Sequence, residues 1–114
     1  MRLGRLGQAR QAFRRALELG TDEIRSRIYL AYVERRLGNP QAAAGILEEG
    51  LNRIPVYGRP HRQEAELLYQ LGLAYSALGR PKDATARLNT ALSLTRYPGQ
   101  RKIIEEAMQS AISK

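Results

Sequence analysis

Cysteine and tryptophan are absent from this sequence of 114 residues, and histidine and phenylalanine occur once each. Without cysteine, the chain can form neither disulfide bonds nor thiolate metal sites. The single histidine, His61, has no second histidine with which to share a metal ion, and no glycine-serine elbow near it supplies a nucleophile. The sequence therefore predicts no metal, no cofactor and no enzymatic activity.

Long hydrophobic runs are also missing. No apolar stretch approaches the ~18 residues that a membrane-spanning helix needs, and the N-terminal residues 1–4 lack the apolar core of a signal peptide. We therefore expect no membrane insertion. The sequence does not specify a compartment; the cytoplasm is favoured for this fragment, and the parent protein could be exported.

Acidic residues are in the minority. Eleven aspartates and glutamates stand against nineteen lysines and arginines, which gives a formal net charge of +8. Such a balance favours acidic partners or polyanions. The glutamates are interleaved with the basic residues, and the last two predicted helices carry no basic stripe. An acidic protein or peptide is therefore the favoured partner, and a nucleic acid is the less favoured alternative.

The abundant residues are helix formers, among them alanine, leucine, arginine and glutamate. A pattern anchored on a Leu-Gly pair occurs three times, followed at fixed distances by an alanine, a large apolar residue, a small residue and a leucine. The copies are Leu3-Gly4, Ala9, Phe13, Ala16, Leu17; Leu37-Gly38, Ala43, Leu47, Gly50, Leu51; and Leu78-Gly79, Ala84, Leu88, Ala91, Leu92. Because glycine ends helices readily and these positions have helical spacing, the pattern predicts repeated helix–turn–helix units.

The glycine spacings divide the chain. Gly4 and Gly38 are 34 residues apart (38 − 4), and Gly38 and Gly79 are 41 apart (79 − 38). We predict one helical-repeat domain over 1–114, made of a half repeat (4–23), a repeat (24–57), an inserted connection (58–64), a repeat (65–98) and a capping helix (99–114). The alternative for the last segment is the first helix of a further repeat.

The half repeat is predicted to be a second helix that has no first helix beside it. Its apolar residues Leu6, Ala9 and Phe13 should then be exposed, or covered by another chain. A fragment of a longer repeat protein is the favoured explanation. The alternative is a self-association module that forms a homodimer through this N-terminal helix.

Residues 65–98 resemble the tetratricopeptide repeat family. Leu71, Gly72, Tyr75, Gly79, Ala84 and Ala91 match its consensus, Leu68 stands where tryptophan is frequent, and Leu88 replaces phenylalanine. The likeness extends over nearly the whole chain. It implies an all-α, right-handed α-solenoid of antiparallel helix pairs, here with about six helices, that binds proteins and performs no reaction.

Residues 24–57 resemble the family less closely. Their first helix has Arg27, Ala31 and Glu34 where an aromatic residue, a glycine and a tyrosine are usual. Glu34 also resembles the glutamate of the half-a-tetratricopeptide variant. The alternative is a carboxylate that pairs with a nearby arginine where two helices meet.

The resemblance implies a concave groove lined by the first helix of each repeat. Residues of these helices that the core pattern does not use should face the groove and bind a peptide or a partner helix. The predicted groove residues are Arg25, Tyr29, Tyr32, Arg36, Tyr69, Gln70 and Leu73, with Ile28, Arg35, Glu66, Ser76, Ala77, Gln100, Ile103 and Ile104 beside them. Tyrosine and arginine are residue types that anchor interfaces, although the tyrosines can instead pack between the helices.

Overall fold

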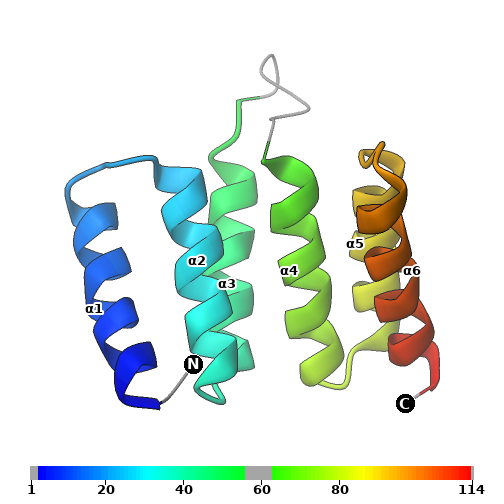
Figure 1. Cartoon of the computed structure of the whole chain (residues 1–114), viewed down its shortest axis with the longest axis horizontal. Helices are drawn as coiled ribbons and strands as arrows, with labels where there is room; N and C mark the ends of the chain where they lie inside the picture. The colour runs from blue at the N-terminus through cyan, green and yellow to red at the C-terminus, as the bar shows by residue number, and fades with distance from the viewer. Residues whose placement is uncertain (1–2, 56–62, 114) are drawn as a thin grey trace.

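The computed structural model of this chain describes residues 3–55 and 63–113. These residues form six α-helices (Figure 1). Their bounds are α1 Leu3–Glu18, α2 Glu23–Arg36, α3 Pro40–Asn52, α4 Glu64–Ala77, α5 Pro81–Ser93 and α6 Pro98–Ser113.

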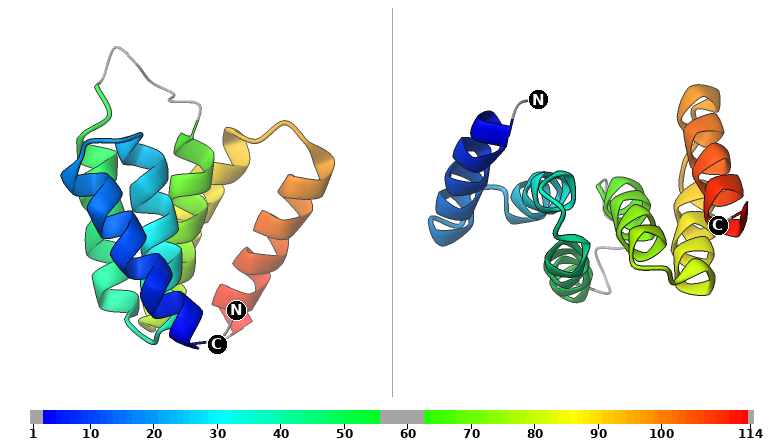
Figure 2. Two further views of the ribbon diagram at one scale, coloured as in Figure 1. Left: turned by 60° about the vertical axis from the view of Figure 1, so that its left-hand side comes forward. Right: turned by 90° about the horizontal axis from the view of Figure 1, so that it is seen from below.

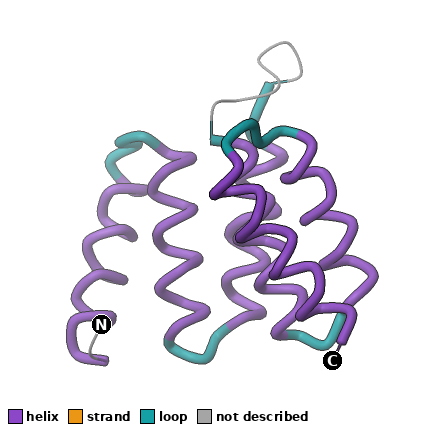
Figure 3. The backbone as a smooth tube through the Cα atoms, turned by 45° about the vertical axis from the view of Figure 1, so that its right-hand side comes forward, coloured by secondary structure: helices purple, strands orange, loops and turns teal. Residues whose placement is uncertain are grey.

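Each helix packs against the next one along the chain, and α4 also contacts α2 and α6. Successive helices run in opposite directions (Figure 1). Within the described ranges there are only helices and loops (Figure 3). In the end-on view, α2 and α4 lie in the middle, α3 and α5 lie below them in the picture, and α1 and α6 lie to the left and right (Figure 2, right). The prediction of an all-helical solenoid with about six helices is confirmed.

Two of the three pattern glycines end helices as predicted. Gly38 has a φ of 87° and Gly79 a φ of 72°, a left-handed conformation in which a side chain would be strained. After each glycine, the next backbone N–H turns back onto the helix: Asn39 donates to the carbonyl of Glu34, and Arg80 to that of Tyr75. Both turns therefore follow directly from the sequence.

Gly4 does not end a helix, because α1 begins at Leu3 and Gly4 lies inside it. The sequence pattern predicted a turn here by analogy with the two other copies. No helix precedes Leu3 in the described part of the chain, so no chain reversal is required at this glycine.

The small residues of the pattern lie where helices approach closely. Gly72, which the family resemblance singled out, lies at a close approach too: a Cβ atom there would be 2.6 Å from the Cγ of Leu88, so α4 and α5 leave no room for a side chain. Ala43, Leu47, Ala84, Leu88 and Ala91 are at most 1% exposed and form the core. The pattern therefore identified the contacts between each first helix and its second helix.

The expectation that Leu6 is exposed was wrong. The Leu6 side chain is 1% exposed, because α1 lies against α2. Ala9 and Phe13 are half-buried rather than bare. A second helix in this fold packs on two first helices, that of its own repeat and that of the next. Leu6 belongs to the second contact, which α2 supplies.

An ion pair also holds α1 against α2. Glu34 of α2 is 4% exposed, and its carboxylate lies 2.8 Å from the Nε of Arg10 and 3.6 Å from an Nη of Arg14. Both arginines keep part of their side chains in water, so the pair is only partly desolvated. The alternative assignment of Glu34, a carboxylate paired at a helix junction, is confirmed.

The last helix begins at Pro98 and packs on α5 and α4. Ile104 and Ala111 are buried, and the guanidinium of Arg101 donates to the carbonyls of Leu92 and Thr95 near the end of α5. Ile112 is 63% exposed, so it lies outside the buried stripe. The helix therefore covers α5 with one face and leaves an apolar residue on another.

Most of the inserted connection predicted for 58–64 lies outside the described residues, and so does His61. The described neighbours place it between α3 and α4.

Candidate binding groove

The concave side of the molecule carries three bays, formed between α1, α2, α4 and α6. The apolar bay, as we call it, has a volume of about 440 Å³ and lies between α1, α2 and α4. The lining residues are Phe13, Ile28, Tyr29, Tyr32, Val33, Glu66 and Gln70. Two further bays of about 370 and 390 Å³ lie between α4 and α6. Glu66 lines the apolar bay and the first of these, and Tyr69 lines both of the α4–α6 bays, so neighbouring bays adjoin one another along α4.

Aromatic rings form one wall of the apolar bay. The rings of Phe13 and Tyr29 have their centroids 5.3 Å apart, with a tilt of 32° between the planes. Tyr29 is 46% exposed, so its ring is open to a ligand. The Tyr32 ring is half-buried beside it. Such surfaces contribute large contact areas at low entropic cost, because each ring has few rotatable bonds.

A polar pair forms the opposite edge of the apolar bay. Gln70 is 8% exposed, and its Nε2 donates to Glu66 Oε1 at 3.1 Å. A carboxylate only accepts hydrogen bonds, so this contact orients the amide of Gln70. The other amide atom, Oε1, is buried and has no hydrogen-bond partner among the described residues. Buried acceptors of this kind are uncommon and call for an explanation.

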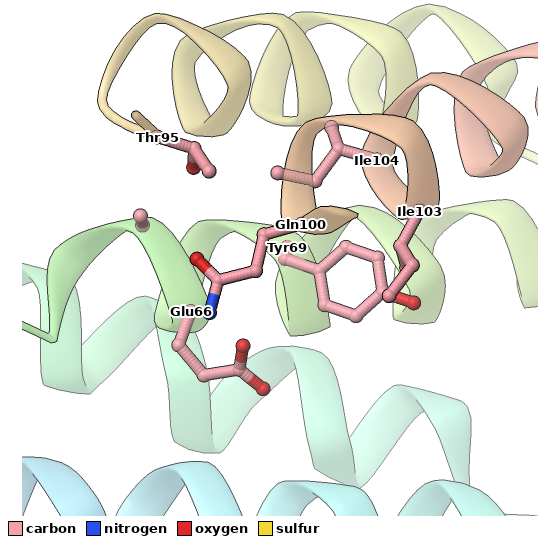
Figure 4. Close-up of a pocket in the computed structure, with 7 residues that line it drawn as sticks. Glu66, Tyr69, Thr95, Gln100, Ile103 and Ile104 are labelled. Atoms are coloured by element: carbon pink, nitrogen blue, oxygen red, sulfur yellow. The ribbon is translucent and has the colours of Figure 1, made fainter. Parts of the chain in front are cut away.

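The bays between α4 and α6 are more polar. Figure 4 shows Glu66 and Tyr69 of α4 facing Gln100 and Ile103 of α6. The neighbouring bay adds a cation and an anion, Arg35 from α2 and Glu106 from α6. The apolar side chain of Leu73 also lines this bay. These bays can bind polar and apolar groups of a partner side by side.

Nearby charges and burial affect two tyrosines of the groove, Tyr32 and Tyr69. The guanidinium groups of Arg35 and Arg36 lie 5.8 Å and 5.9 Å from the centroid of the Tyr32 ring, within the range of cation–π attraction. Burial raises the pKa of Tyr69 above its usual value of 10, and the nearby carboxylate of Glu66 raises it further. The Tyr69 hydroxyl therefore keeps its proton at neutral pH and can donate a hydrogen bond.

Five of the seven predicted groove residues line these bays. Tyr29, Tyr32 and Gln70 meet in the apolar bay, and Tyr69 and Leu73 lie between α4 and α6. Arg25 lines none of the three; it is exposed and pairs with Asp22 at 3.6 Å. Arg36 also lies outside them and reaches the groove only through the ring of Tyr32.

Phe13 was missed as a groove residue. The sequence assigned it to a self-association face, whereas its ring forms a wall of the apolar bay with Tyr29. The large apolar position of the pattern could have suggested this, because a second helix touches the first helix that follows it. Glu106 and Ser110 of α6 were missed as well, since the register of α6 is not set by the pattern. Thr95, in the turn between α5 and α6, was missed because the prediction considered only the first helices and the last helix.

Within 3–55 and 63–113, no group of three or more histidine, aspartate or glutamate side chains gathers in a way that could hold a metal ion. None of the helices in these ranges has the length and apolar character needed to cross a membrane.

Comparison with known proteins identifies a family. A family model described as tetratricopeptide repeat matches residues 22–96, from the start of α2 to just beyond α5. The comparisons with curated proteins and with solved structures found no match. The resemblance of 24–57 to the half-a-tetratricopeptide variant stays a prediction.

Proposed function

The chain belongs to the tetratricopeptide repeat family, and on this premise we propose that it is a scaffold that binds a peptide or a partner helix along the groove between α1 and α6. Tetratricopeptide repeats generally mediate protein–protein interaction and are not catalytic. Fold alone does not fix function, so the proposal depends on the groove itself.

The observation that carries the proposal is that the three bays adjoin one another along α4. An apolar bay with aromatic walls leads along α4 into two more polar bays, with Glu66 and Tyr69 shared between them. Protein-binding sites combine buried aromatic anchors with polar groups around them. An extended peptide or an amphipathic helix can place apolar side chains in successive bays, as in helix-in-groove recognition.

Charge favours an acidic partner. Arg35 and Arg36 stand beside Tyr32, and the chain as a whole carries a net charge of +8. Arginine binds carboxylates through two parallel hydrogen bonds. Glu66 and Glu106 also face the bays and can accept hydrogen bonds from the partner. The proposed ligand is therefore a segment with apolar anchors and more acidic than basic residues.

The test is a selection of peptides from a random library on the immobilised chain, followed by measurement of their Kd. The combination Tyr32→Ala, Arg36→Ala and Tyr69→Ala should weaken binding by about 100-fold or more, because two or more anchors of ~1–2 kcal/mol each are lost. The matched control is Gln41→Ala, Lys82→Ala and Asn89→Ala, three exposed residues of α3 and α5.

The control variant should bind like the original chain, and circular dichroism should show unchanged helicity in both variants. Equal binding by the groove variant would remove the groove from the proposal. A loss of binding in the control variant alone would move the site to α3 and α5.

Self-association is a second candidate function. It is favoured by the different exposure of equivalent pattern residues in α1, α3 and α5. Ala9, Phe13 and Ala16 of α1 are half-exposed, whereas the residues at the same positions in α3 and α5 are buried. A second copy could cover this face. Light scattering at increasing concentration should then show a dimer. The substitution Ala12→Glu, at an exposed residue of α1, should dissociate this dimer. A monomer at every concentration would exclude self-association.

A further inference from the structure

The helices alternate in role along the chain, and the two outermost helices each show one half of a repeat. A first helix, α2 or α4, packs on its own second helix, α3 or α5. By its contacts, α1 is a second helix that touches only the following first helix, α2. By the same criterion α6 is a first helix, because it packs on α5 and α4 as α4 packs on α3 and α2. Within the described residues, α1 has no first helix of its own and α6 has no second helix.

The open side of α6 is the side that a first helix turns toward its second helix. In α4, Leu67 lies beside Gly50 of the preceding second helix. In α6, Ile104 lies in one cluster with Ala91, the counterpart of Gly50 in α5. With Ile104 aligned to Leu67, the α6 residues at the positions of Leu68, Gly72 and Tyr75 are Glu105, Gln109 and Ile112. The three α4 residues are buried, whereas the three α6 residues are exposed, Ile112 by 63%.

We propose that α6 of one copy and α1 of a second copy pair as the first and second helix of a repeat, so that the chain associates head to tail. This proposal rests on the self-association considered above and names the face of the second copy that covers α1. Within one molecule α1 and α6 lie at opposite sides and do not touch (Figure 1). Because α1 begins and α6 ends at the same lower edge, a second copy in the same orientation brings the two helices together antiparallel, as α4 and α5 are (Figure 1).

The register of the pairing follows from the contact of α4 with α5. Gly72 of α4 lies against Leu88 of α5. The counterpart of Gly72 in α6 is Gln109, and the residue of α1 at the pattern position of Leu88 is Phe13. Phe13 is half-exposed, whereas Leu88 is fully buried, so the second copy covers a large apolar side chain that the chain alone leaves partly open.

Charge on the two faces is complementary. Helix α1 carries four arginines and one glutamate. In the antiparallel register, the turn of α6 before Gln109 contains Glu105, and the turn of α1 after Phe13 contains Arg15. Both charged residues are exposed, and neither forms an ion pair with another described residue. The pairing therefore sets an unpaired carboxylate opposite an unpaired guanidinium.

A charged residue at this contact has a precedent inside the molecule. Arg27 of α2 stands at the position that Glu105 has in α6, and its side chain packs beside Gly50 of α3. Its guanidinium donates to the carbonyl of Ile46 and pairs with Glu23 at 3.2 Å. A first helix can thus hold a charged side chain against its second helix when a partner group is supplied.

The experiment blocks each face separately with a charge at an exposed residue, by Ala12→Glu on α1 and by Ile112→Glu on α6. Light scattering then follows the mass of the species as the concentration rises. The original chain should form trimers and larger species, because every added copy keeps one open face. Each variant alone should stay a monomer. An equimolar mixture of the two should form dimers and nothing larger, because one intact pair of faces remains.

The matched control is Gln41→Glu, which adds the same charge at an exposed residue of α3 and should associate like the original chain. Circular dichroism should show unchanged helicity in all three variants, since each changed side chain is exposed.

Gln109→Ala tests the same pairing in the opposite direction. The side chain of Gln109 stands where α4 has a glycine and α2 has the buried Ala31, so it keeps α6 further from a second helix. Its removal should lower the concentration at which half of the chains are associated by about two- to tenfold. Gln100→Ala changes an exposed residue on the groove side of α6 and should leave this concentration unchanged.

A monomer at every concentration would overturn the proposal together with self-association itself. Dimers that persist in Ile112→Glu or in Ala12→Glu alone would overturn only the head-to-tail pairing, because they require like faces to meet. Unchanged association of Gln109→Ala would overturn the register. The groove function has a separate outcome, since peptide binding that depends on Tyr32, Arg36 and Tyr69 does not require either end face.

Discussion

Replacing Gly72 with alanine is expected to lower the free energy of unfolding by about 1–3 kcal/mol, as overpacking of a tight core does. The added Cβ would lie 2.6 Å from Leu88 Cγ and 2.7 Å from its Cδ2, and 3.3 Å from the carbonyl oxygen of Ala84. Leu88 is fully buried, and shifting a packed core side chain costs free energy. The intrinsic preference of alanine over glycine in a helix, ~0.5–1 kcal/mol, offsets only part of this cost.

The matched control is Gly45→Ala in α3. Gly45 is exposed within a helix, and a Cβ added there meets nothing within 4 Å. This substitution should raise the free energy of unfolding by about 0.5–1 kcal/mol. Urea titrations of both variants measure the difference. A lower free energy of unfolding for Gly72→Ala and a higher one for Gly45→Ala would support the close contact of α4 and α5. An equal increase for both variants would contradict it.

Replacing Leu6 with aspartate is expected to detach α1 from the rest of the molecule. The substitution removes a buried leucine side chain, worth about 2–5 kcal/mol, and puts a carboxylate in its place. Since α1 packs only against α2, its release does not require the other five helices to unfold. Hydrogen exchange followed by mass spectrometry should show the amides of α1 exchanging about 100-fold faster or more, with α4 and α5 little changed.

Ala12→Asp is the control for this second prediction, because Ala12 is exposed on the same helix. It introduces the same charge without touching the contact with α2 and should leave exchange in α1 nearly unchanged. Equal effects of the two substitutions would mean that charge on α1, rather than burial of Leu6, governs its docking.

The repeat structure could be predicted from sequence because it depends on local rules. A glycine at positive φ ends α2 and α4, and a fixed spacing of alanine and leucine brings each first helix against its second helix. Both effects involve residues that are close along the chain. The helical repeats and the buried position of Leu88 therefore followed from the pattern, and Gly72 followed from the family resemblance.

The environment of α1 could not be predicted in the same way. The pattern treats Gly4 as a turn and Leu6 as exposed, because it describes how a second helix meets its own first helix. The contact of α1 with the following first helix depends on tertiary packing between different repeats. For Glu34, pairing with an arginine at a helix junction was one of two alternatives, but the partner could not be named, because Arg10 is far from Glu34 in the sequence.

The residues that line the bays were predicted in outline and missed in detail. Residues of α2 and α4 that the core pattern does not use must lie on another face of the helix. This reasoning found Tyr29, Tyr32, Tyr69 and Gln70, which line the bays. The same reasoning gives no information on which side chains a neighbouring helix covers. Arg25 was therefore included although it lies outside the bays, and Phe13 was left out.

The measurement that tests the central claim most directly is a map of where a selected peptide contacts the chain, obtained from hydrogen exchange or amide shifts of the complex. We predict that protection and shifts concentrate on α2, α4 and α6, with the aromatic part of α1 around Phe13, and that α3 and α5 stay unchanged. Protection concentrated on α3 and α5 would contradict the groove as the binding face.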